Sequence, residues 1–191
     1  RQEILHVFGR PFAPPAADDD PAPGGPALGR VALAAERALP QDELRVVRLP
    51  WVYGPGGLAR DLIVGLRTQR HRIVGTGDNR WALLSAADAA AAMRAAAAAP
   101  PGRYTAAEAD PPTQEDVIRA ICAVPGHRFP DHVPRRLAAL SMGGPMAEAL
   151  ACSLAVRTGR LGELGWAPQR RWPRDLVSLA EGSLPLPVRA T

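Results

Sequence analysis

Short apolar runs alternate with helical segments along the middle of the chain, and this alternation constrains the fold more than any other feature. Residues 44–49 (LRVVRL) and 72–74 (RIV) have the composition of buried strands, and residues 58–69 between them predict a helix. Residues 50–57 (PWVYGPGG) predict the turn that joins strand to helix. Strands separated by a helix favour a parallel sheet, because parallel neighbours need a long crossover connection. The sequence therefore predicts an α/β fold.

Other segments add elements of the same kind. Further strands are predicted at 3–8, 81–84 and 103–106, and helices at 27–39 and 86–99. Thr113 is placed as an N-cap with Asp116 at N3, a capping-box pattern that opens another helix. The helix at 27–39 carries an apolar stripe formed by Leu28, Val31, Ala35 and Leu39.

The last third of the chain predicts a small helical lobe, with helical pieces at 135–142, 145–156 and 173–180. Trp166, between the last two, is interpreted as a core anchor of this lobe. We therefore divide the chain into a sheet-forming part at 1–109, a substrate lobe at 110–181 and a tail at 182–191. A loop rich in proline and glycine is expected at 9–26.

Composition argues against several classes of protein. All 23 basic residues are arginine, and they are spread from Arg1 to Arg189 among 19 acidic residues, so we expect no nucleic-acid partner. No apolar run reaches the roughly 18–20 residues that cross a bilayer, so we expect no membrane insertion. Cys122 and Cys152 form no CxxC pair and no signal-like segment opens the chain, which predicts a reduced, cytoplasmic protein.

Four segments in order carry a resemblance to a known family. Residues 48–57 (RLPWVYGPGG) are similar to the motif R-x-x-x-V-Y-G-P-G, and residues 72–79, 83–90 and 164–168 (LGWAP) resemble later motifs. Residues 6–179 thus resemble the second half of an extended short-chain dehydrogenase/reductase, of the NAD-dependent epimerase/dehydratase superfamily. This implies a partial doubly wound (Rossmann-like) parallel sheet with a small helical C-terminal substrate lobe.

The chain departs from this family at the positions that transfer hydride. Aligning residues 33–37 (LAAER) with the family's catalytic helix puts Leu28 where the tyrosine acid/base belongs and Ala32 where the lysine belongs, and the sequence has no lysine. The glycine-rich G-x-x-G-x-x-G loop is also missing from the sequence. NAD(P) is the cofactor implied by the resemblance, yet we predict no catalytic residues and no bound cofactor, with Leu49 and Pro50 left as a nicotinamide-side wall.

The substrate positions of the resemblance also differ. Trp51 replaces an asparagine typical of sugar-nucleotide members, and Trp81 stands where they carry an arginine for the diphosphate. Ser85 stands where the family usually has histidine, and Arg80 lies near the expected cleft. Large apolar faces replace polar groups, so the predicted substrate-binding residues Trp51, Arg80 and Trp81 indicate a small ligand that is not a nucleotide sugar.

Residues 54–59 (GPGGLA) formally match the dinucleotide fingerprint G-x-G-x-x-G/A, but a structural turn is favoured. Residues 50–53 intervene between the expected strand and the first glycine, and Pro55 has no amide to offer a phosphate.

Two further groups have a structural and a functional interpretation. Tyr53 and Asp88 are favoured as structural residues over an acid/base pair, since neither has a visible activating partner. His127, Asp131 and His132 are interpreted as a solvated loop without a metal.

Several hypotheses about the whole protein stay open. The chain is a gene fragment, a pseudoenzyme or a subunit whose partner supplies the cofactor half, and the missing tyrosine and lysine favour the pseudoenzyme. The alternatives are a cofactor-independent enzyme that uses Tyr53, Asp88 or Arg80, and an interaction or assembly module with an arginine surface. We also expect a homo-oligomer, or a partner that covers an exposed sheet edge.

Overall fold

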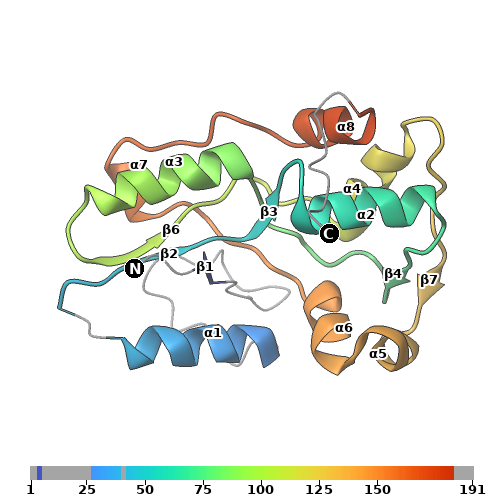
Figure 1. Ribbon diagram of the computed structural model, residues 1–191, viewed down its shortest axis with the longest axis horizontal. Coiled ribbons are helices and arrows are strands. Elements are labelled where there is room, and N and C mark those ends of the chain that lie inside the picture. The colour runs from blue at the N-terminus through green and yellow to red at the C-terminus, as the bar shows by residue number, and fades with distance from the viewer. Residues whose placement is uncertain (1–3, 6–26, 40–41, 183–191) are drawn as a thin grey trace, which may run out of the picture.

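The computed structural model describes residues 4–5, 27–39 and 42–182 of the 191-residue chain (Figure 1). The loop expected at 9–26 and most of the expected tail lie outside these residues. The first half contains β1 (Ile4–Leu5), α1 (Ala27–Ala38), β2 (Arg45–Arg48), β3 (Trp51–Tyr53), α2 (Gly57–Arg67), β4 (Ile73–Val74), β5 (Leu83–Ser85) and α3 (Ala86–Ala97). The second half contains β6 (Gly102–Thr105), α4 (Gln114–Cys122), β7 (His132–Val133), α5 (Arg135–Met142), α6 (Gly144–Ala151), α7 (Arg160–Glu163) and α8 (Arg174–Ala180).

The strand pairs that the structure describes are all parallel, as the sequence predicts. β1, β2 and β6 form a three-stranded sheet in the order β1–β2–β6, and β3 pairs with β5. Leu49 and Pro50 separate β2 from β3. Because proline has no N–H for a ladder, pairing with β6 ends there, and the N–H of Trp51 then donates to the carbonyl of Ala82 beside β5 (3.1 Å).

Two predictions in this region are wrong. The predicted turn at 50–57 contains strand β3, because the residue types of Trp51–Tyr53 favour a strand once β5 offers a partner. The strand predicted at 72–74 does not return to the sheet of β2, since β4 pairs with β7 at the other end of the molecule. That pairing also makes residues 132–133, expected to be a solvated loop, a short strand.

Helices cover both faces of the β1–β2–β6 sheet. In Figure 1, α3 and α7 lie on one side of this sheet and α1 on the other. The predicted capping box is confirmed, because Thr113 Oγ1 accepts from Asp116 N and Asp116 Oδ2 accepts from Thr113 N, both at 3.0 Å. A second core packs α2 against α4 and α8, across the predicted boundary at residue 109, through Ile63, Leu66, Val117, Ile118, Leu176 and Leu179.

The C-terminal part differs from its prediction in two details. α6 ends at Ala151, earlier than the predicted end at 156, because the chain turns extended at Cys152 and Leu154 N donates to the carbonyl of Arg80 (2.7 Å). Trp166 is half-buried and does not anchor the C-terminal lobe. It packs instead on the core between the sheet and α3, against the cluster that includes Val47 and Leu84.

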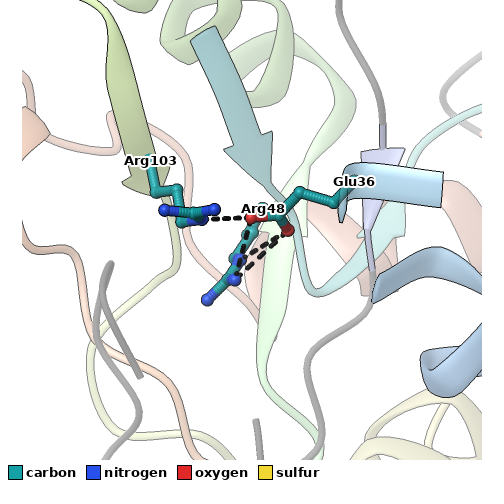
Figure 2. A network of polar contacts seen from close by, with 3 residues as sticks. All are labelled: Glu36, Arg48 and Arg103. Atoms are coloured by element: carbon teal, nitrogen blue, oxygen red, sulfur yellow. Dashed lines mark hydrogen bonds and ion pairs between the residues drawn. The ribbon is translucent and has the colours of Figure 1, made fainter. Parts of the chain in front are cut away.

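A buried ion cluster joins α1 to the sheet (Figure 2). Glu36 of α1 is 2% exposed and Arg48 of β2 is 4% exposed. Arg48 donates through Nε to Glu36 Oε2 at 3.3 Å and through Nη2 to Oε1 at 3.2 Å. Arg103 of β6 donates to the same carboxylate. Arg48 is thus a hydrogen-bonding residue at a strand end, and the carboxylate of Glu36 joins α1 to both β2 and β6.

Replacing the carboxylate of Glu36 is expected to destabilise the folded chain. Glu36→Ala should lower the free energy of unfolding by about 3–5 kcal/mol, because removing one partner of a buried pair leaves the other charge uncompensated. Urea unfolding of the two proteins measures the difference. Glu115→Ala is the matched control, since Glu115 pairs with Arg119 on the surface of α4, and it should cost at most about 1 kcal/mol. Equal losses in the two variants would contradict a stabilising role for the cluster.

Two of the four residues of the apolar stripe predicted on α1, Val31 and Ala35, are exposed, and Leu39 is half-buried. Val31 is 69% exposed and Ala35 is exposed as well, while Glu36 takes the inward face. The side chain of Leu28 lies outside the described residues. Among the strands that the structure describes, β1 has β2 as its one neighbour. An exposed apolar helix face and a strand with one described neighbour are features that favour association.

We therefore expect self-association through α1. Sedimentation at micromolar concentration should show a dimer or a larger species, and Val31→Glu should shift it toward the monomer because a charge would enter the contact. A wild-type protein that sediments as a compact monomer would remove this expectation.

Candidate functional site

The main candidate site is an apolar cavity of about 190 Å³ between β3, β5, α2 and α8. Trp51 and Trp81 form one wall, with their rings stacked at a centroid distance of 5.5 Å and an interplanar angle of 28°. The structure thus brings together two of the three residues predicted for substrate binding. The rest of the lining is Val52, Tyr53, Leu58, Ala59, Asp61, Leu62, His71, Leu83, Val117, Met146, Leu150 and Leu176.

Backbone contacts fix the tryptophan wall. The N–H of Trp81 donates to Pro112 O (2.8 Å), and its indole Nε1 donates to Leu150 O (3.4 Å), so the buried ring keeps its polar atom satisfied. Trp51 is carried by β3, directly after the break at Pro50. The Trp51–Trp81 cavity therefore exists because β3 and β5 pair where the sheet of β2 ends.

Arg80, the third predicted substrate residue, does not line this cavity. It is exposed, and its Nη1 donates to Pro111 O (2.8 Å). Its backbone N–H donates to Ser153 Oγ (3.0 Å). These contacts make Arg80 a residue that connects loops, and its predicted ligand role stays a prediction.

Tyr53 is committed to a partner that the sequence analysis missed. Its hydroxyl donates to Oε1 of the buried Glu108 at 2.7 Å. Burial, and then the hydrogen bond and charge of Glu108, raise the pKa of Tyr53. Burial also raises the pKa of Glu108, whose Oε2 accepts from Trp172 N at 3.0 Å. Tyr53 thus stays protonated and donates to a buried carboxylate. This agrees with its interpretation as a structural residue and not as an acid/base.

Asp88 also has a structural set of partners. It lies in the first turn of α3, where Ser85 caps the helix by accepting from Asp88 N (3.0 Å). The Asp88 carboxylate accepts from Gln169 N (3.0 Å) and Arg170 N (2.8 Å). Ser85, which stands at the family's histidine position, is therefore a helix cap here.

His71 is a second residue that the sequence analysis missed, and no local pattern marks it. It follows α2 and is half-buried, with its backbone N–H donating to Gly65 O (3.1 Å). Its Nε2 is buried and has no hydrogen-bond partner among the described residues. Burial, helped by the charge of Arg72, lowers the pKa of His71 to about 4, so the ring is neutral at physiological pH.

The cofactor residues predicted from the resemblance do not line the Trp51–Trp81 cavity. Leu49 lines a second cavity of about 400 Å³, and Pro50 is buried outside that lining. The other lining residues are all apolar: Val52, Leu58, Ala86, Ala89, Ala90 and Met93. A dinucleotide needs donors for its ribose and pyrophosphate. The residues that line this wall therefore do not fit NAD(P).

The segment that mimics a phosphate loop has a packing explanation. β3 runs directly into Gly54. The prediction that non-strand residues separate the strand from the first glycine is therefore wrong. A Cβ at Gly54 would nevertheless lie 2.9 Å from the Cβ of Ala86, which requires glycine for close packing on α3. Pro55 still removes an amide donor. The structural turn remains the favoured interpretation.

Two other expectations concern metals and membranes. No group of three potential metal ligands occurs among the described residues, His127, Asp131 and His132 included. Within the same residues, no helix is long and apolar enough to cross a membrane.

Comparison with solved structures identifies the fold. No protein-family model matches the sequence, and neither does any curated protein. A human epimerase family protein with NADPH has a TM-score of 0.74 at 19% identity, covering 95% of this chain and 63% of that one. A functionally unknown conserved protein from Silicibacter pomeroyi has a TM-score of 0.75 at 24% identity, covering 96% of this chain and 66% of that one.

A dTDP-glucose 4,6-dehydratase from Bacillus anthracis in complex with NAD has a TM-score of 0.73 at 15% identity, covering 94% of this chain and 60% of that one. This chain therefore spans less than two thirds of each of these three proteins. The predicted fold class is confirmed: the described residues have a Rossmann-like α/β fold of the kind found in NAD-dependent epimerases and dehydratases.

The neutral state of His71 predicts a pH dependence of stability. The unfolded chain binds a proton at this residue near pH 6.5, whereas the folded chain does so only near pH 4. The contribution of His71 is therefore full above pH 6.5 and is lost as the pH falls through this window. Urea unfolding should show the wild type losing stability relative to His71→Gln between pH 6.5 and 4.

If the free energies of unfolding of the wild type and His71→Gln depend on pH in parallel, His71 titrates alike in the folded and unfolded chain, and this prediction is contradicted.

Proposed function

We propose that this chain is a catalytically degenerate relative of the NAD(P)-dependent epimerase/dehydratase family, whose remaining activity is to bind a small ligand in the Trp51–Trp81 cavity. The observation that carries the proposal is this cavity, formed by the two tryptophans that replace polar substrate residues of the family pattern. The likeness in fold supports the family relationship, together with the four motifs in order.

Loss of hydride transfer is inferred from residues that lie within the sequence. Leu28 and Ala32 occupy the tyrosine and lysine positions of the resemblance, and neither side chain has a proton to exchange. The sequence contains Tyr53 and Tyr104 as its only tyrosines. Tyr53 donates to Glu108 and Tyr104 donates to Pro100 O, so each is used within the fold.

The size and lining of the cavity support a small, apolar ligand. Sites for drug-sized ligands usually measure about 300–1,000 Å³, whereas this cavity measures about 190 Å³. A sugar nucleotide also needs cationic or amide donors for its diphosphate. No arginine is among the residues that line the cavity. A nucleotide sugar is therefore a poor fit, in agreement with the ligand class expected from Trp51 and Trp81.

Calorimetric titration tests both halves of the proposal. Toluene should bind saturably, because an apolar ring gains free energy by leaving water for an apolar cavity. NAD(H) and NADP(H) should bind at millimolar concentration or more weakly, since the wall at Leu49 offers mainly van der Waals contact. Saturable dinucleotide binding at micromolar concentration would contradict the proposal. Residues 54–59 would then be the first candidates for a phosphate-binding site.

Paired variants on α2 locate the toluene site. Leu62 lines the cavity, so Leu62→Trp should fill it and abolish toluene binding. Val64 lies on the exposed face of the same helix at 39% exposure, so Val64→Trp should bind toluene like the wild type. Equal binding by both variants would place the toluene elsewhere.

A further inference from the structure

We propose that the ligand of the Trp51–Trp81 cavity is a neutral single-ring compound with one hydroxyl group, and that His71 is the residue that recognises the hydroxyl. This inference rests on the proposed function and specifies its ligand. Three observations carry it: the volume of the cavity, the charges in its lining, and an imidazole without a hydrogen-bond partner among the described residues.

The volume sets the size of the ligand. An apolar protein cavity of about 150 Å³ holds one benzene molecule. The Trp51–Trp81 cavity measures about 190 Å³, which leaves room for one ring and a small substituent. Trp51 and Trp81 are stacked on each other, so the second ring is covered by the first and they do not form an open cage around a cation.

The charges in the lining select a neutral ligand. Apart from Tyr53, the lining residues with an ionisable side chain are Asp61 and His71. The carboxylate of Asp61 is part of the lining and disfavours an anion. His71 is neutral, so it offers no countercharge, and an ionised ligand would lose its hydration among apolar side chains. A neutral ring therefore loses the least on entry.

His71 supplies the polar contact. Its Nε2 is buried and has no hydrogen-bond partner among the described residues, which costs free energy that a ligand can recover. A hydroxyl both donates and accepts, so it matches either tautomer of the neutral ring. The nitrogen is covered by protein atoms, so recognition requires the imidazole to turn about Cβ–Cγ, a torsion with broad preferences.

Contacts of the main chain hold the backbone of His71 in place. Its N–H donates to Gly65 O, and a Cβ added at Gly65 would lie 3.3 Å from the Cβ of His71. Its carbonyl accepts from Arg72 Nη1 at 2.7 Å. His71 also lines a second, polar cavity of about 90 Å³, together with Asp131 and Arg128. The residue therefore lies between two existing spaces.

The test compares phenol with toluene, which have nearly the same ring volume and differ in the hydroxyl. Calorimetric titration of the wild-type chain should give phenol about tenfold tighter binding than toluene, the factor that one hydrogen bond of about 1.4 kcal/mol contributes. Benzoate and benzyltrimethylammonium should both bind more weakly than phenol. In His71→Phe the ratio of phenol to toluene affinity should fall from about ten to about one, because the hydrogen-bonding imidazole is gone.

Each outcome decides the proposal. Equal binding of phenol and toluene to the wild type overturns it, and leaves the proposed function intact because toluene still binds. If benzoate or benzyltrimethylammonium binds more tightly than phenol, the inference that the ligand is neutral is overturned. Retention of the phenol preference in His71→Phe overturns the role of His71. If neither toluene nor phenol binds, the proposed function fails, and this inference fails with it. The wild-type comparison needs no variant, so it decides even if His71→Phe does not fold.

Discussion

Two buried carboxylates hold the chain before α8 against the sheet-forming part, and the Trp51–Trp81 cavity depends on this attachment. Asp88 accepts the N–H groups of Gln169 and Arg170, and Glu108 accepts that of Trp172. Hydrogen bonds from backbone amides to a carboxylate are stronger than those between neutral groups. α8 begins two residues after Trp172, and its Leu176 lines the cavity. The wall that α8 provides is therefore positioned by acids that belong to α3 and to the segment after β6.

The same interactions explain why the polar residues of this region are poor candidates for catalysis. Tyr53 directs its hydroxyl to Glu108, and Asp88 directs its oxygens to amides of the segment that leads to α8. Catalytic groups need a proton or a lone pair available to the substrate. Here these groups are used to join two parts of the fold, which is why we propose the tryptophans and His71, and not Tyr53 or Asp88, as the residues that contact a ligand.

The sheet topology and the cavity have one local origin. Pro50 ends the pairing of β2 with β6, and the chain continues as β3 beside β5. This change of neighbour places Trp51 beside the start of β5, where Trp81 is buried, and the two rings stack. A residue with a backbone donor at position 50 would allow the first ladder to continue, so the missing N–H of proline contributes to the site.

The sequence by itself determined the α/β class and the helix start at Thr113, because periodicity and capping are local properties. The loss of the catalytic tyrosine and lysine stays a prediction from the resemblance. The sequence also indicated Trp51 and Trp81 as ligand residues. Tertiary structure alone decided that β4 pairs with β7, that Trp166 packs on the sheet, that His71 lines the cavity and that Glu108 holds Tyr53. Each of these depends on contacts between distant segments, such as β4 with β7 or Glu108 with Trp172. No pattern of neighbouring residues records such contacts, because burial and partner choice arise only when the segments pack together.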